Sequence, residues 1–315
     1  MYLVAAVLIV AIAAVAITAG VLIAGDDDND TVVAATSSTT AVTTTVAPSP
    51  TVAGTRYRDE VFTDYTLQSD LQYGSAPGSD GAPEALMLDL YEPAGDTAPK
   101  RPAIVWVHGG GFKSGDKAGV VPAVMAPFYA ELGYVVVSIN YRLLAPNGCV
   151  GPEGVSAACF EAGKQAVYDA LAAVRWLRAH AAEYDIDPDR IGIGGESAGA
   201  IVATGVGVHA DDPGESGNPG FDSTVDGWFS ISGGVPGGLY VDATDAPGLL
   251  ISGTADNLVP YQWSVDTAKA LVAAGVSATL TTLDGAGHVP FVEYGDQMKN
   301  ESTAFFYKTL DLADA

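Results

Sequence analysis

Residues 191–200 read Ile-Gly-Ile-Gly-Gly-Glu-Ser-Ala-Gly-Ala, and this stretch decides the fold class. It begins as a short apolar strand, its segment 195–199 fits the pattern G-x-S-x-G, and an alanine-rich helical pattern follows. A strand, a turn so tight that only small side chains fit beside the serine, and a helix are the context of a nucleophile elbow. Such a turn lifts the Ser197 hydroxyl out of the sheet edge. The five residues alone fit an ordinary glycine-rich turn equally well, so their meaning depends on partners elsewhere in the chain.

Asp256 and His288 each follow a later predicted strand. The apolar strand over residues 249–253 ends just before Asp256, and His288 closes the glycine loop that follows the last strand, residues 277–283. In an open parallel sheet, ligand-binding groups gather at the carboxyl ends of the strands. We therefore expect both side chains to lie near the serine.

The chain order Ser197, Asp256, His288 is an established order for a serine triad. In that arrangement His288 takes the serine proton and passes it to the leaving group, while Asp256 fixes the imidazole tautomer. Asp284 is a rival acid, but it lies four residues before His288, at a strand end whose loop would have to fold back. We therefore expect Asp256 to be the partner of His288.

A glycine run after another buried strand supplies hydrogen-bond donors. Residues 102–108 are nearly all apolar, as expected of a central strand covered on both faces, and residues 108–112 read His-Gly-Gly-Gly-Phe. Glycines let the backbone turn sharply and aim its N–H groups at a ligand, so this loop is a candidate oxyanion hole; a flexible glycine loop is the alternative. Each such donor contributes about 2.7–4 kcal/mol of transition-state stabilisation. We expect His108 to hold the loop by hydrogen bonds rather than to act as a base.

The length and charge of the chain limit the classes of protein that it fits. The chain has 315 residues, which suits one large α/β domain, residues 55–315, behind an unusual N-terminus. Its net charge is −24, with 38 acidic against 14 basic residues. This excess argues against nucleic acid and anionic membrane surfaces as partners. No motif calls for a metal or a cofactor, so none is expected.

The N-terminus consists of an apolar segment and a linker. Residues 2–25 form an uncharged apolar run, and about 20 such residues span a bilayer. The apolar core of a signal peptide has about 7–15 residues, so we interpret residues 1–25 as an uncleaved transmembrane anchor, with a cleaved signal as the alternative. Residues 26–54 are first acidic and then rich in Thr and Pro, which is typical of a tether. The domain is then expected outside the cytoplasm, with membrane contact only through this N-terminal segment.

The only two cysteines, Cys149 and Cys159, lie in a segment predicted to be a loop, residues 145–162. Outside the cytoplasm their oxidation is permitted, and we expect a disulfide between them; two free thiols are the alternative. Closing so short a loop contributes up to roughly 3 kcal/mol in the chain-entropy model. No ligand-spaced His or Cys accompanies them, which argues against a metal site.

From residue 108 to residue 288 the sequence resembles α/β-hydrolase carboxylesterases with an HGGG loop, and the likeness extends back to about residue 59. Four short segments carry the resemblance: residues 108–112, 115–117, 141–142 and 195–199. Residues 88–93, Leu-Asp-Leu-Tyr-Glu-Pro, resemble the branch that includes bifunctional feruloyl and acetyl xylan esterases. These motifs are specific for the superfamily and weak for the substrate.

The resemblance implies an α/β-hydrolase fold, with an eight-stranded, mostly parallel sheet and helices on both faces. It also implies an oxyanion hole formed by the N–H groups of Gly109, Gly110 and Ala198. Lipase-like relatives usually carry a helical cap ahead of the HGGG strand, whereas only strands are predicted here. Without a large cap domain the site would be open and shallow, which favours bulky or polymeric alcohols over long acyl chains.

The expected function is that of a serine carboxylesterase acting on a small-molecule or carbohydrate-linked ester, with a short acyl group. Ser197 would form an acyl-enzyme, and water activated by His288 would release the acid. A serine peptidase of the same fold is one alternative, but it would usually carry an extra domain to exclude large substrates. A non-catalytic, hydrolase-like binding module is another, but it would be expected to have lost triad residues.

Overall fold

The computed structural model describes residues 53–144, 150–151, 154–208, 212–238 and 240–313. The predicted anchor (residues 1–25), nearly all of the linker (26–54) and Cys149 lie outside these residues. The anchor, the tether and the Cys149–Cys159 disulfide therefore stay predictions. Among the helices that the structure describes, none is both long and apolar enough to cross a membrane.

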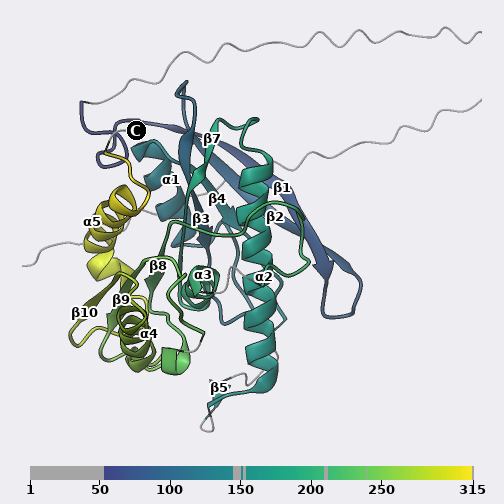
Figure 1. Ribbon diagram of the computed structural model, residues 1–315, viewed down its shortest axis with the longest axis vertical. Coiled ribbons are helices and arrows are strands. Elements are labelled where there is room, and N and C mark those ends of the chain that lie inside the picture. The colour runs from purple at the N-terminus through teal and green to yellow at the C-terminus, as the bar shows by residue number, and fades with distance from the viewer. Residues whose placement is uncertain (1–52, 145–149, 152–153, 209–211, 239, 314–315) are drawn as a thin grey trace, which may run out of the picture. The chain divides into compact units, whose positions relative to one another are not determined.

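The domain is built on an eight-stranded sheet with the order β1-β2-β4-β3-β7-β8-β9-β10 (Figure 1). Its strands are β1 Tyr65–Pro77, β2 Pro83–Pro93, β3 Arg101–Val107, β4 Val135–Ile139, β7 Ile186–Glu196, β8 Gly227–Ile231, β9 Gly248–Gly253 and β10 Ala278–Leu283. Six neighbouring strands of the sheet run parallel to one another: β4, β3, β7, β8, β9 and β10. Strand β2 is antiparallel to both of its neighbours, β1 and β4. The predicted eight-stranded, mostly parallel sheet is confirmed.

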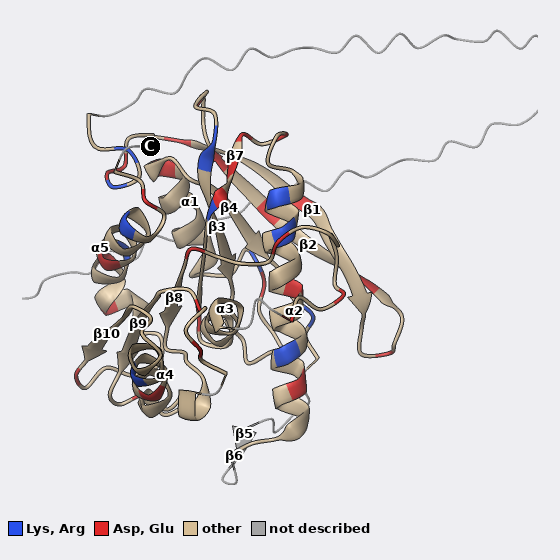
Figure 2. Cartoon of the chain, in the orientation of Figure 1, with Lys and Arg blue, Asp and Glu red and all other residues tan. Residues whose placement is uncertain are grey.

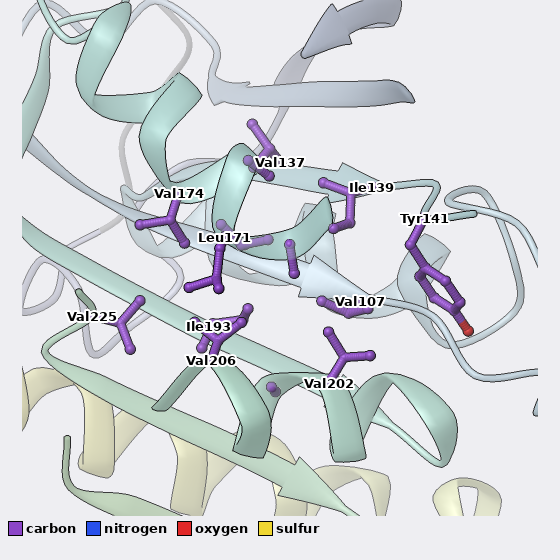
Figure 3. Close-up of a cluster of buried hydrophobic side chains, with 14 of the residues drawn as sticks. Val107, Val137, Ile139, Tyr141, Leu171, Val174, Ile193, Val202, Val206 and Val225 are labelled. Atoms are coloured by element: carbon purple, nitrogen blue, oxygen red, sulfur yellow. The ribbon is translucent and has the colours of Figure 1, made fainter. Parts of the chain in front are cut away.

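Helices cover both faces of the sheet. The described helices are α1 Pro122–Leu132, α2 Ala157–Ala179, α3 Ala198–Val208, α4 Tyr261–Ala273 and α5 Phe291–Thr309, with a short 3-10 turn, η1, at Pro236–Gly238. On one face, Leu171 of α2, Val202 of α3 and Val107 of β3 belong to one cluster of buried apolar side chains (Figure 3). On the other face, Phe306 of α5 belongs to the apolar cluster that contains Trp106. Alternate residues of β3 thus face opposite layers, which is why residues 102–107 are apolar and the whole strand is buried.

The first strand differs from the prediction. The sequence suggests a strand over residues 61–67 and a long glycine- and serine-rich connection over 74–81, whereas β1 continues to Pro77. Its last residues pair with β2, with Gly74 opposite Leu86 and Ser75 opposite Ala85. Because β1 is an edge strand with many exposed side chains, it lacks the apolar pattern by which a strand is recognised.

Two helices begin at other residues than the sequence suggests. Helix α2 begins at Ala157, within the predicted loop 145–162, because Ser156 caps it: the Ser156 Oγ accepts a hydrogen bond from the Cys159 N–H at 3.2 Å. A two-stranded ribbon, β5 Val150–Gly151 with β6 Gly154–Val155, precedes it. Helix α1 begins at Pro122 rather than near residue 114, with the proline at its first turn.

Acidic and basic side chains are spread over the loops and helices of the domain rather than gathered on one element (Figure 2). Helix α2 carries side chains of both signs along its length.

A buried ion pair ties three loops to α2. The Arg142 guanidinium, just after β4, donates to the Asp169 carboxylate at 2.7 Å, and both side chains are almost fully buried. Arg142 also donates to the carbonyl of Pro77 at 3.0 Å, and the Ser216 hydroxyl donates to Asp169 at 2.6 Å. The ends of β1 and β4 and the loop that contains Ser216 are thereby held against one helix.

We predict that Asp169→Ala lowers the free energy of unfolding by about 3–5 kcal/mol, because it leaves the Arg142 charge buried without its partner. Urea unfolding of the wild type and the variant, followed by circular dichroism, measures this difference. Glu161→Ala, which removes an exposed carboxylate from the same helix, is the control and should change stability by less than about 0.5 kcal/mol. Equal stability of the two variants would contradict the role assigned to the pair.

Candidate active site

Ser197 occupies the turn between β7 and α3 in a left-handed backbone conformation, with φ of +56°. A non-glycine residue in this region is strained by about 1–3 kcal/mol and persists where its surroundings hold it. The Ser197 N–H donates to the carbonyl of Ile231 at the end of β8, at 2.9 Å. A side chain at Gly199 would place its Cβ 2.1 Å from the carbonyl oxygen of Val107 in β3. The G-x-S-x-G pattern therefore forms the predicted elbow, with the backbone of β3 packed against it.

The structure brings Ser197, His288 and Asp256 into one hydrogen-bonded chain. The Ser197 Oγ lies 2.8 Å from the His288 Nε2, and the His288 Nδ1 lies 2.8 Å from the Asp256 Oδ2. The other oxygen of Asp256 accepts hydrogen bonds from the backbone N–H groups of Leu258 and Val259, at 2.9 and 3.0 Å. The Asp256 carboxylate is completely buried, so its orientation is fixed.

This geometry fits the roles predicted for the three residues. With its Nδ1 proton donated to Asp256, His288 presents the lone pair of Nε2 to the Ser197 hydroxyl, as a general base requires. The rival acid Asp284 accepts instead from the Thr254 hydroxyl at 3.1 Å. Asp256 is thus the carboxylate that contacts His288.

One of the three predicted oxyanion-hole donors, the Gly109 N–H group, has another role in the structure. The Gly109 N–H donates to the Glu196 Oε1 at 2.9 Å, so it is already bonded and is not available to an oxyanion. The N–H groups of Gly110 and Ala198 have no acceptor within the described part of the chain, and the same holds for Gly111. Gly110 and Gly111, both at positive φ, form the sharp turn of the loop. Gly110 and Ala198 therefore remain oxyanion-hole candidates, and Gly111 replaces Gly109.

Glu196, the variable residue before the serine, is the functional residue that sequence reasoning missed. Its carboxyl group is buried and accepts a second hydrogen bond from the Trp106 Nε1–H at 3.1 Å. Burial raises the pKa of Glu196 from 4.5 to about 8. Because it neighbours Ser197 in the chain and bonds Gly109 in space, Glu196 joins the elbow to the glycine loop. A carboxyl group in the middle of an otherwise small and apolar stretch was the available signal.

His108 holds the glycine loop, as predicted. Its Nδ1–H donates to the Gly109 carbonyl at 2.6 Å, and its ring stacks on Tyr141 with 4.4 Å between the ring centres. The Tyr141 hydroxyl donates in turn to the His108 carbonyl at 3.1 Å. Burial lowers the pKa of His108, which favours a neutral ring.

Ser197 and His288 open into a cavity of about 1320 Å³. Pockets that hold drug-sized ligands have volumes of about 300–1,000 Å³, so this cavity is larger than most of them; the open, shallow site suggested by the missing cap stays a prediction. The walls come from the glycine loop, the first turns of α2, the exposed side of α3 and the loops after β8 and β9. Their side chains include Phe112, Phe160, Ile201 and Trp263.

We predict that Glu196→Gln lowers kcat/KM by roughly tenfold or more, mainly through kcat. A glutamine cannot accept from both the Trp106 and the Gly109 donors through two oxygens, so the glycine loop loses its alignment; loss of a whole oxyanion donor costs about 10²–10³. Steady-state hydrolysis of p-nitrophenyl acetate measures the effect. Glu131→Gln, at a partly buried carboxyl that does not line the cavity, is the control. Unchanged kcat in the Glu196 variant would contradict the alignment role.

The raised pKa of Glu196 also predicts how stability depends on pH. Between about pH 4.5 and about pH 8 the native state keeps a proton that the unfolded chain has released. The free energy of unfolding therefore falls as pH rises through this window. Glu196→Gln should show a smaller fall than the wild type when urea unfolding is measured at about pH 5, 6.5 and 8. Parallel curves for the two proteins would contradict this linkage.

Comparison with known proteins agrees with this geometry. The BD-FAE family model matches residues 88–231, from β2 to the end of β8. Fumonisin B1 esterase of Sphingopyxis macrogoltabida is 34% identical over 166 residues, which are 49% of this chain and 28% of that protein. The chain thus matches less than a third of the length of this curated relative.

Solved structures match more of the chain. A truncated carbohydrate esterase from gut microbiota superposes with a TM-score of 0.64 at 24% identity, covering 78% of this chain and 96% of that one. Thermogutta terrifontis esterase 2 with bound propionate superposes with a TM-score of 0.59 at 26% identity, covering 79% and 92%. The sheet order, the elbow and these matches show an α/β-hydrolase fold, and the central region, residues 88–231, is similar to the BD-FAE family.

Proposed function

We propose that this chain is a serine carboxylic ester hydrolase that works through an acyl-enzyme. The observation that carries the proposal is the Ser197 Oγ, 2.8 Å from a His288 Nε2 whose ring is oriented by buried Asp256. His288 removes the serine proton as Oγ attacks the ester carbonyl, and the N–H groups of Gly110, Gly111 and Ala198 receive the oxyanion. His288 then protonates the departing alcohol. Water attacks the acyl-enzyme by the same route and releases the acid.

The proposed acyl group is short. Esterase 2 of Thermogutta terrifontis, 26% identical to this chain, has been solved with bound propionate and with bound butyrate. The same esterase has also been solved phosphorylated by paraoxon, an organophosphate. These likenesses support short-chain acyl esters as substrates. The likenesses do not point to one class of alcohol in the substrate, since the similar proteins include a carbohydrate esterase and a fumonisin esterase.

The two rival functions find less support. The hydrogen-bonded Ser197–His288–Asp256 geometry argues against a binding module without activity. The described residues form a single α/β unit with no added domain to exclude large substrates, and the relatives described above are esterases. Ester hydrolysis therefore accounts for more of the observations than peptide hydrolysis.

We also propose that the catalytic domain lies outside the cytoplasm, attached through residues 1–25. The support is the uncharged apolar run at residues 2–25 and the Thr- and Pro-rich segment behind it. An oxidising location would also suit a Cys149–Cys159 disulfide. Protease accessibility of the domain in intact cells, with a cytoplasmic protein as control, tests this placement. Protection of the domain would contradict it.

We predict that Ser197→Ala lowers kcat on p-nitrophenyl acetate by about 10⁴-fold or more, because no other hydroxyl is placed against His288 in the described site. Assays with p-nitrophenyl esters from acetate to dodecanoate should show the highest kcat/KM at short acyl chains. Ser277→Ala, at an exposed serine before β10, is the matched control and should leave activity unchanged. If the folded wild type hydrolyses none of these esters, the esterase proposal is wrong, and a peptidase or a binding module becomes the better explanation.

A further inference from the structure

The mouth of the cavity is lined by apolar side chains that are open to solvent. Ten large hydrophobic side chains are exposed in the described residues, and five of them line this one cavity. They are Val120, Val155, Phe160, Tyr240 and Leu258. They come from the loop before α1, the segments at the start of α2, the loop after β8 and the loop after β9. An exposed apolar patch of this kind on a soluble domain marks a binding surface.

The volume of the cavity is much larger than a short acyl group needs. About 1320 Å³ exceeds the usual volume of a pocket for a drug-sized ligand, whereas an acetyl or butyryl group has only a few non-hydrogen atoms. If the acyl group is short, as proposed above, most of the cavity is left for the alcohol. The alcohol must then fill a wide space whose mouth is apolar.

Two carboxylates of the lining, Asp116 and Asp212, accept hydrogen bonds within the protein. Asp116 accepts hydrogen bonds from the Ala118 N–H at 2.8 Å and from the Asn140 side chain at 3.0 Å. Asp212 accepts from the Tyr168 hydroxyl at 2.5 Å, and the Lys164 Nζ lies 5.2 Å from the centre of the Tyr168 ring. Most of the other side chains at the mouth are apolar, which suits an apolar group better than a sugar, because a sugar needs many hydrogen-bonding partners.

Phe160 is the aromatic ring on the α2 side of the mouth. Its side chain lies in the first turn of α2 and is 49% exposed, although it belongs to the wall of a cavity that contains Ser197. Lys164 and Val167 follow on the same side of the helix, so this wall extends over about 10 Å of α2. A flat apolar group placed here would cover Phe160 and remove apolar surface from water on both molecules.

We propose that the cavity binds the alcohol part of the substrate, and that this alcohol is a large, mainly apolar group, such as a fused-ring or biaryl alcohol, rather than a plain sugar. This inference rests on the proposed esterase activity with short acyl groups. It predicts that kcat/KM among acetate esters rises with the apolar size of the alcohol. Phe160 is the specificity-determining residue that we assign to this preference.

Phenyl acetate, 1-naphthyl acetate and 4-biphenylyl acetate test the proposal on the full-length protein. Their leaving phenols have similar acidity and all three give the same acetyl-enzyme, so differences in kcat/KM report binding of the alcohol during acylation. We expect the two larger esters to exceed phenyl acetate by about tenfold or more. Cyclohexyl acetate should likewise exceed a methyl mono-O-acetyl-xylopyranoside, whose alcohol is also a secondary ring alcohol.

Substitutions of Phe160 test whether this residue causes the preference for large apolar alcohols. Phe160→Ala should reduce the naphthyl-to-phenyl ratio of kcat/KM by several-fold, and a circular dichroism spectrum and urea unfolding curve like those of the wild type show that the variant is folded. Phe160→Leu should keep part of the preference. Phe221→Ala is the matched control, since Phe221 is exposed to a similar extent (46%) but does not line the cavity. Its ratio should equal that of the wild type.

Three outcomes would overturn the inference. Equal kcat/KM values of the wild type for the three aryl acetates would show that the apolar mouth does not bind the alcohol. A higher kcat/KM for the acetylated xyloside than for cyclohexyl acetate would assign the cavity to a sugar. An unchanged ratio in Phe160→Ala would remove Phe160 from the site. Absence of hydrolysis for every acetate ester is different, because it would overturn the esterase proposal itself.

Discussion

The close approach of three backbone segments at Ser197 is the constraint on which the rest of the site depends. The first turn of α3 touches β3 where Gly199 meets the Val107 carbonyl, and the Ser197 N–H bonds the Ile231 carbonyl at the end of β8. The nucleophile is therefore held between two strands of the central sheet rather than on a loop. A reactive group on rigid elements keeps its position to a fraction of an ångström, which the chemistry of acyl transfer requires. The backbone of Ser197 has a positive φ, and the hydrogen bond to Ile231 and the packing at Gly199 hold it there.

The parallel sheet then brings the other groups to the same edge. Ser197 and His288 are 91 residues apart in the chain, yet β7 and β10, which they follow, belong to one parallel set of strands and end at the same edge of the sheet. Asp256 is buried behind His288, with one oxygen bonded by two backbone N–H groups and the other by the imidazole. The buried carboxylate thus has partners on both oxygens, which offsets the cost of removing it from water.

Glu196 connects the nucleophile elbow to the glycine loop. It belongs to the elbow by sequence and to the glycine loop by its hydrogen bond to Gly109. Its raised pKa reflects burial, whose effect exceeds the opposite effect of the hydrogen bonds from Gly109 and Trp106. Because the Gly109 donor is already bonded, Gly110 and Gly111 remain as the free N–H groups of the turn. The same arrangement that aligns the loop therefore also decides which glycines can stabilise an oxyanion.

The sequence by itself determined the features that depend on short-range patterns. The elbow, the glycine run, the apolar strands and the order Ser197, Asp256, His288 are all visible there, because turn chemistry and apolar periodicity act over a few neighbouring residues. The choice of Asp256 over Asp284 was also predicted from the sequence, and the tertiary structure confirms it through the contact of Asp256 with His288. Only the tertiary structure decided that the Gly109 N–H is bonded to Glu196. It also decided the role of Glu196 and the size of the cavity. Each of these arises from contacts between residues far apart in the chain, and such contacts leave no local pattern in the sequence.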